Sequence, residues 1–127
     1  MVGIDTNILI YFLEKNPDHY EKSYALLNDL VKKDEEICIS SLIFTEILSG
    51  TKNKDFFGLL LSSPFSLYDI TQGVAVLAGR LRYNNKWLKT ADALHIATAM
   101  YAGANRFYTN DKNLKKIRAD IEIVNLA

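Results

Sequence analysis

Residues 1–13, MVGIDTNILIYFL, place an acid between a short apolar run and a helical pattern. The run VGI at 2–4 reads as a short strand, and TNILIYFLEKN at 6–16 reads as a helix. Asp5 stands between them, where it is either a helix cap or the first ligand of a metal site. The rest of the chain has to decide between these two roles.

Short apolar runs and helical patterns alternate along the whole chain. Further strands are expected at 37–40 (ICIS), 66–70 (SLYDI), 106–109 (RFYT) and 121–124 (IEIV). Helices are expected at 19–33, 41–50, 53–63, 71–85, 89–104 and, as a short one, 110–117. Thr71 is a plausible cap, and Gly50, Pro64 and Gly103 are placed to end helices. This alternation predicts an α/β fold, a three-layer α/β/α sandwich with a central, mostly parallel five-stranded sheet, formed by one domain over residues 1–127.

The composition is that of an ordinary globular domain. Of the 127 residues, 49% are hydrophobic and 24% are charged, so there is enough apolar material for a core. Fifteen basic residues balance fifteen acidic ones, so any contact with nucleic acid must rest on local patches. The single Cys38 makes no internal disulfide, and no signal-peptide pattern is present, so we expect a cytoplasmic protein. The stretch ADALHIATAMYAGA is too short and too polar to cross a membrane.

Four acids fall near the expected carboxyl ends of the strands. These are Asp5 after the first strand, Glu46 in the helix after the second, Asp92 in the first turn of the Ala-rich helix, and Asp111 after the fourth strand. In open α/β sheets the functional site forms at this edge. Carboxylates gathered there repel one another unless a cation neutralises them, and hard oxygen ligands favour Mg²⁺ or Mn²⁺. Such a site suits phosphodiester hydrolysis.

Each acid also has a purely structural interpretation. Asp5, Asp92 and Asp111 all sit at helix starts, where caps and first-turn acids are common. Glu46 differs, because it borders the apolar face of its helix, where an unpaired acid is costly. His95 is more often a packed, hydrogen-bonded core residue than a base.

Several polar and basic residues lie beside the acids. Asn7, Ser40 and Thr109 are candidates to hydrogen-bond the carboxylates, whereas Thr6, Asn7 and Asn110 read equally as plain cap and turn residues. Basic residues cluster at Arg80/Arg82/Lys86/Lys89 and at Lys112/Lys115/Lys116/Arg118, mostly as solvated helix faces. Lys52, Lys54 and Lys112 are nearest to the expected site, where they are candidates for phosphate contacts.

Four segments in order resemble the PIN-domain family, particularly VapC-type toxins of toxin–antitoxin pairs. These segments are IDTNILI, SSLIFTEILSG, TADALHIATA and YTNDKNL, and the resemblance runs from residue 2 to residue 124. It implies that Asp5, Glu46, Asp92 and Asp111 bind Mg²⁺ or Mn²⁺ and catalyse endoribonuclease cleavage of RNA. It also implies a homodimer, a cognate antitoxin whose C-terminal segment occupies the active-site groove, a supporting role for Thr109 beside the fourth acid, and a structural role for His95.

Three other interpretations remain open at this stage. A metal-independent nuclease would use His19 or His95 as acid and base, and its activity would survive chelators. A catalytically silent module would keep the fold only to bind RNA or protein. A PIN nuclease of RNA processing would have the same acids without being a toxin.

Overall fold

The computed structural model describes residues 1–50, 56–62 and 64–126, and these form five strands and seven helices. The strands are β1 (Val2–Ile4), β2 (Ile37–Ser40), β3 (Phe65–Tyr68), β4 (Arg106–Thr109) and β5 (Glu122–Asn125). The helices are α1 (Thr6–Leu13), α2 (Tyr20–Lys32), α3 (Leu42–Gly50), α4 (Phe56–Leu60), α5 (Gln72–Asn84), α6 (Thr90–Ala102) and the 3₁₀ helix η1 (Lys112–Lys116).

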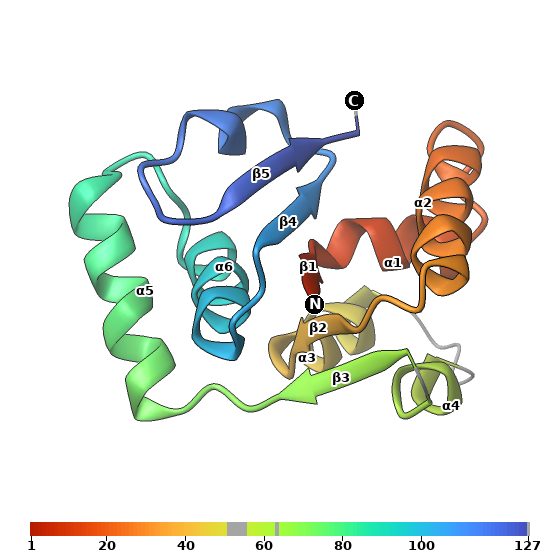
Figure 1. The fold of residues 1–127 in the computed structure, drawn as a ribbon, viewed down its shortest axis with the longest axis horizontal. Helices are drawn as coiled ribbons and strands as arrows, with labels where there is room; N and C mark the ends of the chain where they lie inside the picture. Colours follow the sequence, from red (N-terminus) through yellow and green to blue (C-terminus); the bar gives the residue numbers. More distant parts are fainter. Residues whose placement is uncertain (51–55, 63, 127) are drawn as a thin grey trace.

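The strands form one sheet in the order β3-β2-β1-β4-β5, and all four neighbouring pairs are parallel. The predicted five-stranded α/β sheet is therefore confirmed. Strand β1 is the central strand, with β2 and β3 on one side of it and β4 and β5 on the other (Figure 1). Because the strands run in one direction, their carboxyl ends meet at a single edge, where the four acids were expected.

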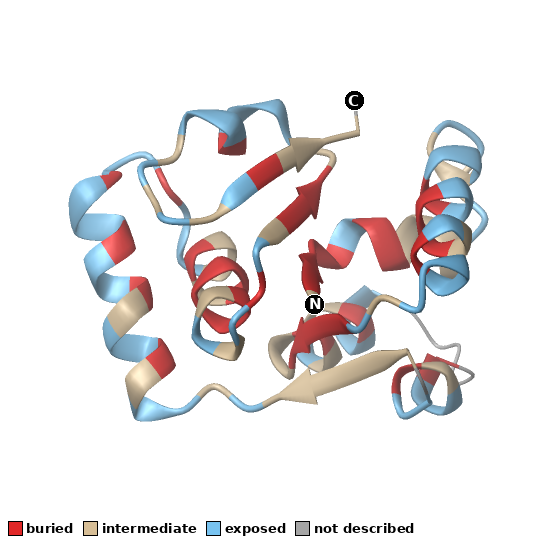
Figure 2. Ribbon diagram, viewed as in Figure 1, coloured by how far each residue is buried: buried red, intermediate tan, exposed pale blue. Residues whose placement is uncertain are grey.

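Helices cover both faces of the sheet and make two separate hydrophobic cores. One core joins α1–α4 to the face of the sheet that carries Val2, Ile4 and Tyr108. The other joins α5, α6 and η1 to the face that carries Phe107 and Ile123. Figure 2 shows the buried residues on the strands and on the inward sides of the helices. The alternation of Phe107 and Tyr108 between the two cores follows from the pleat of a strand buried on both faces.

Some element boundaries differ from those predicted. Helix α1 ends at Leu13 rather than Asn16, because Lys15 takes a positive φ of 50° and the residue before Pro17 disfavours helical geometry. Strand β3 covers 65–68 rather than 66–70, because its partner β2 ends at Ser40, opposite Tyr68.

The predicted helix at 53–63 is seen as α4, which spans only Phe56–Leu60, and residues 51–55, 63 and 127 lie outside the described residues. The short helix at 110–117 is the 3₁₀ helix η1. The predicted helix ends at Thr71 and Gly103 are confirmed: the Thr71 side chain accepts a hydrogen bond from the Val74 N–H, and Gly103 takes a left-handed φ of 90°. In the described part of the chain, no helix has the length and apolarity needed to cross a membrane.

Candidate active site

Asp5 does not act as a helix cap. It occupies the N-cap position of α1, yet its side chain makes no capping hydrogen bond to the helix. Its carboxylate instead accepts a hydrogen bond from the Thr109 hydroxyl at 3.0 Å, and its own N–H donates to the Tyr108 carbonyl at 2.8 Å. Asp5 is 6% exposed and Thr109 is fully buried, so this carboxylate is held between the ends of β1 and β4.

Thr109 also joins Asp5 to Asp111. Its hydroxyl oxygen accepts a hydrogen bond from the Asp111 N–H at 3.0 Å while it donates to Asp5. The Asp111 side chain accepts from the Asn113 N–H at 2.9 Å and so caps η1. Asp111 therefore caps a helix, which is the structural interpretation given for it above. Its side chain is exposed and follows β4, the strand that ends beside Asp5.

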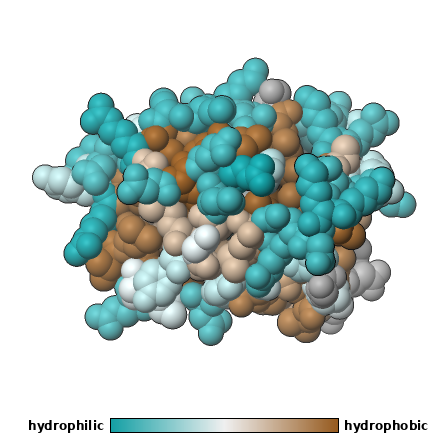
Figure 3. Space-filling model, in the orientation of Figure 1, coloured by the Kyte–Doolittle hydropathy of each residue, from teal (hydrophilic) through white to brown (hydrophobic). Residues whose placement is uncertain are grey.

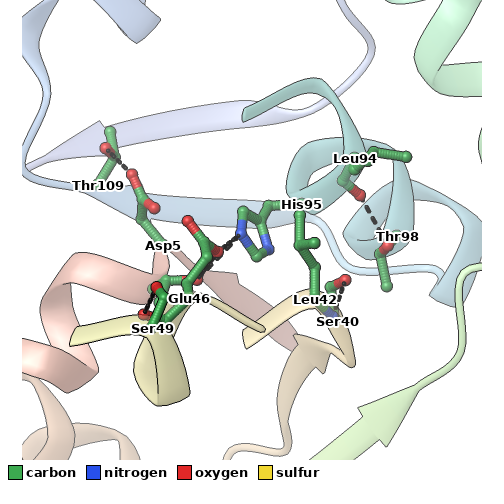
Figure 4. A network of polar contacts seen from close by, with 10 residues as sticks. Asp5, Ser40, Leu42, Glu46, Ser49, Leu94, His95, Thr98 and Thr109 are labelled. Carbon is green, nitrogen blue, oxygen red and sulfur yellow. Dashed lines mark hydrogen bonds and ion pairs between the residues drawn. The ribbon is translucent and has the colours of Figure 1, made fainter. Parts of the chain in front are cut away.

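Glu46 reaches the same place from α3. Its carboxylate contacts His95 Nε2 and accepts a hydrogen bond from the Thr6 hydroxyl at 3.0 Å (Figure 4). Thr6 directly follows Asp5, and His95 lies three residues after Asp92, on the same side of α6. These contacts bring helices α1, α3 and α6 together around the acids. His95 is 4% exposed, so the prediction of a packed, hydrogen-bonded histidine is confirmed.

Electrostatic effects link the four acids pairwise, since the charge of Glu46 acts on Asp5 and the charges of Asp5 and Asp111 act on Asp92. Burial, followed by the charges of Asp5 and Asp111, raises the pKa of Asp92 to about 6. Burial raises the pKa of Asp5, and the nearby charge of Glu46 raises it further, while the Thr109 hydrogen bond lowers it in part. Burial alone would raise the pKa of Glu46, but the His95 contact and the Thr6 hydrogen bond hold it below its usual value. The fold therefore gathers acids that oppose one another's ionisation.

The donor set fits a hard divalent cation, although the side chains do not form a finished coordination shell. Among the described residues, no group of three or more His, Cys, Asp or Glu side chains is placed to hold a metal ion. Glu46 is instead engaged by His95 and Thr6. The Asp92 carboxylate accepts no hydrogen bond from any described residue, which leaves its oxygens available to a ligand. Cation binding would require the carboxylates to come closer together than they are here.

The structure corrects the predictions for Thr6 and Ser40 and favours the cap-or-turn interpretation of Asn7. Thr6 is not a plain cap residue, since its buried hydroxyl donates to Glu46. Ser40 does not contact an acid, because its hydroxyl accepts from the Leu42 N–H at the start of α3. Asn7 is exposed and makes no side-chain hydrogen bond to another described residue. Lys52 and Lys54 lie outside the described residues.

His19 is also placed differently from the prediction. The expected helix over 19–33 begins one residue later, at Tyr20, and His19 is half-buried immediately before it, where its ring stacks on Tyr11 with centroids 4.4 Å apart. Its Nδ1 lies 3.0 Å from the Asn110 amide nitrogen. His19 and His95 share no hydrogen-bond partner, so the structure does not pair them as acid and base.

Thr109→Val tests whether the shared hydroxyl orients the acids. The substitution keeps the side-chain volume but removes the donor to Asp5, and groups that orient metal ligands typically contribute about 10–100-fold to activity or metal affinity. We expect the RNA cleavage that the family resemblance implies to fall by about that factor. Thr98→Val is the matched control, because Thr98 is equally buried but donates to the Leu94 carbonyl within α6. Equal activity of the two variants would contradict an orienting role for Thr109.

Comparison with known proteins agrees with this fold. The family model described as "PIN domain" matches residues 2–120. The chain is 29% identical over 112 residues to Ribonuclease VapC19 of Mycobacterium tuberculosis, covering 84% of this chain and 86% of that protein. VapBC2 from Rickettsia felis, solved bound to a DNA fragment from its promoter, is 25% identical with a TM-score of 0.75 and covers 98% of both chains. A toxin–antitoxin complex from Klebsiella pneumoniae has the same fold, with 24% identity, a TM-score of 0.71 and coverage of 100% of this chain and 98% of that one. The chain therefore belongs to the PIN-domain family.

Proposed function

We propose that this protein is a metal-dependent endoribonuclease and the toxin of a toxin–antitoxin pair. The observation that carries the proposal is the group of acids at the carboxyl edge of the sheet, where burial and the charges of Asp5 and Asp111 raise the pKa of Asp92 to about 6. Such a group is costly without a counter-ion. Among the described residues, Glu46 pairs with His95, and no Lys or Arg side chain makes an ion pair with any of the four acids. Similarity to Ribonuclease VapC19 supports RNA as the substrate.

Each residue of the site then has a defined task. Asp5, Glu46, Asp92 and Asp111 would hold Mg²⁺ or Mn²⁺, which supplies an activated water and offsets charge on the phosphate. Thr109 fixes the direction of the Asp5 carboxylate through its hydrogen bond. Thr6 and His95 hold Glu46 at the border of the site, and the burial of Asp5 limits its access to bulk water. Attack by water in line with the leaving oxygen needs no 2′-hydroxyl of the substrate as nucleophile.

The surroundings of the site support an antitoxin as a second partner. An apolar groove of about 210 Å³ adjoins Glu46. Its lining residues are Ile10, Leu13, Glu14, Glu46, Ile47, Gly50 and Phe56. A segment of an antitoxin placed there would cover Glu46 and so block the site, and solved relatives include toxin–antitoxin complexes. A homodimer belongs to the same proposal through the resemblance to VapC-type toxins.

Cleavage of a mixed pool of structured and single-stranded RNA tests the proposed activity. The purified protein is assayed with Mg²⁺ or Mn²⁺, with EDTA, and as Asp5→Asn under matched folding controls. We expect cleavage only with metal and none by Asp5→Asn, because that substitution removes the most buried carboxylate of the site. Cleavage that persists in EDTA would contradict the metal mechanism and favour one based on His19 or His95. Absence of cleavage by a folded, antitoxin-free protein would favour the silent binding module.

Toxicity in cells separates the toxin from a nuclease of RNA processing. Induced expression of the wild-type chain is expected to arrest growth, and co-expression of its antitoxin is expected to restore growth. Asp5→Asn, expressed at the same level, is the matched control and is expected to leave growth unchanged. Active enzyme that does not slow growth would favour an RNA-processing role.

A further inference from the structure

Residues 71–119 carry most of the positive charge of the molecule. This segment contains nine basic residues and only two acidic ones, and the two acids are Asp92 and Asp111 of the active site. The two basic clusters recognised in the sequence lie 20 or more residues apart along the chain, at 80–89 and 112–118. The balanced overall charge therefore includes one strongly basic segment, residues 71–119.

The fold brings these two clusters onto one surface. Asn85, which follows α5 and is 3% exposed, donates to the carbonyl oxygens of Leu81 and Arg118 at 2.8 and 3.2 Å. Its own side-chain oxygen accepts from the Arg118 N–H at 2.8 Å. These three hydrogen bonds fix the C-terminal end of α5 to the chain that follows η1. Figure 3 shows hydrophilic residues along the top and left edges of this face, as well as on its right-hand side.

Aromatic rings alternate with cations on this surface. The Lys86 ammonium lies 4.2 Å from the ring centroid of Tyr83, and the Lys116 ammonium lies 4.7 Å from the ring of Trp87. Both distances are typical of cation–π contacts. Tyr83 is 73% exposed and Trp87 is 39% exposed, so each ring keeps accessible area beside its cation. The second contact also joins the residues after α5 to η1.

The same surface borders the acids of the active site. Lys89 precedes α6, and its charge acts on Asp92, while Lys112 directly follows Asp111. None of the basic residues of this surface forms an ion pair with another described residue. The positive charge is therefore available to a negatively charged partner that also reaches the catalytic rim.

We propose that this surface, formed by Tyr83, Lys86, Trp87, Lys89, Lys112 and Lys116, binds single-stranded RNA and leads it to the acids. The proposal rests on the proposed nuclease function and names its substrate class. Alternating rings and cations are the pattern that holds single strands, because bases stack on the rings while the ammonium groups neutralise phosphates. Exposed rings flanked by unpaired lysines favour a nucleic acid over an acidic protein segment, which would use the charges but not the ring faces.

Fluorescence of Trp87 gives a direct test, because it is the only tryptophan in the chain. A ten-nucleotide 2′-O-methyl RNA of mixed sequence is added in EDTA, so that no cleavage occurs. We expect quenching of the Trp87 emission, and affinity that falls with salt. Lys116→Gln is expected to reduce the slope of log K against log salt by about 0.7, the value for one phosphate contact on a single strand. Poly-glutamate of matched charge is expected to quench much less.

Binding of the same labelled RNA by anisotropy completes the test. Trp87→Ala and Tyr83→Ala are each expected to weaken binding about tenfold, since each removes one stacking ring. Lys32→Ala is the matched control, because Lys32 is an exposed lysine on α2, on the other side of the sheet. If Trp87→Ala fails to fold, Tyr83→Ala and Lys116→Gln still decide, because both side chains are exposed.

The outcomes separate this proposal from the nuclease proposal. In one outcome the wild-type protein cleaves RNA with metal, and all three variants bind RNA as tightly as the wild type. That result would overturn the RNA-binding surface and leave the nuclease proposal intact. RNA binding that quenches Trp87 and is lost in the variants, without any cleavage, would support the surface and overturn the nuclease. Equal quenching by poly-glutamate would overturn the assignment to RNA in favour of an acidic protein partner.

Discussion

Asp92→Asn is expected to abolish RNA cleavage while it stabilises the metal-free protein at pH 7. The loss of cleavage should exceed about a hundredfold, because even groups that only orient metal ligands typically contribute about 10–100-fold. The gain in stability follows from the raised pKa of Asp92, which is about 6 in the folded protein against 3.8 for an ordinary Asp. At pH 7 the folded state must hold this charge at a cost, and asparagine removes it.

The sign of the pH dependence can be worked out for the metal-free protein. Between about pH 4 and pH 6 the folded state binds more protons at Asp92 than the unfolded chain, so the free energy of unfolding falls as the pH rises. Two pKa units correspond to about 3 kcal/mol, and solvent screening at this partly exposed side chain reduces that to about 1–2 kcal/mol. Thermal unfolding in EDTA at pH 5 and pH 7 measures the effect, with an expected rise of about 5 °C for Asp92→Asn at pH 7.

Asp120→Asn is the matched control for this prediction. Asp120 is an exposed acid that does not contribute to the pKa shifts of Asp5, Glu46 or Asp92, so its substitution should leave cleavage and the pH dependence unchanged. A lower melting temperature for Asp92→Asn at pH 7 would show that the carboxylate stabilises α6 as a simple first-turn acid. The repulsion within the acid group would then be refuted.

Gly3→Ala is expected to destabilise the protein strongly, because Gly3 lies in β1 directly beneath α6. A Cβ at this position would lie 2.7 Å from Ala99 Cβ and 2.9 Å from Phe107 Cδ2. Ala99 is fixed to the backbone of α6, so the helix would have to move away from β1, and overpacking of this kind costs about 1–3 kcal/mol or more. Because α6 carries Asp92 and His95, cleavage should fall as well.

Chemical unfolding of two further variants checks this explanation. Gly79→Ala is the control, since a Cβ there meets nothing within 4 Å and should stabilise α5 by about 0.5–1 kcal/mol. The double variant Gly3→Ala/Ala99→Gly removes the closest contact and should recover part of the stability lost in Gly3→Ala. A double variant no more stable than Gly3→Ala would show that contact with Ala99 is not the cause.

The order of elements was predictable because each strand and helix is marked locally. Thr71 and Gly103 cap their helices as their residue types predict, and the acids follow the strands at the edge where parallel strands end. The extent of β3 was not predictable in this way, because its end is set by Ser40 on another strand. A strand end that is set by the length of the neighbouring strand cannot be predicted from the sequence of that segment alone.

The contacts within the site were less predictable than the acids themselves. Thr6 was interpreted as a cap residue because its neighbours alone do not show that Glu46, forty residues later, lies within hydrogen-bond distance. Ser40 was interpreted as a partner of the acids, but its hydroxyl is used locally by the Leu42 N–H. The joining of the two basic clusters depends on Asn85, whose buried hydrogen bonds to Arg118 leave no local signal in the sequence.

Calorimetric titration of the metal-free, antitoxin-free protein with Mn²⁺ decides whether the four acids bind a metal. We expect the wild-type protein and Asp120→Asn to bind Mn²⁺, whereas Asp5→Asn and Asp92→Asn should bind it at least about tenfold more weakly. Both weakened variants must first be shown to be folded by their unfolding transitions. Equal Mn²⁺ affinity in all four proteins, or no binding to the wild type, would contradict the assignment of these carboxylates as a metal site.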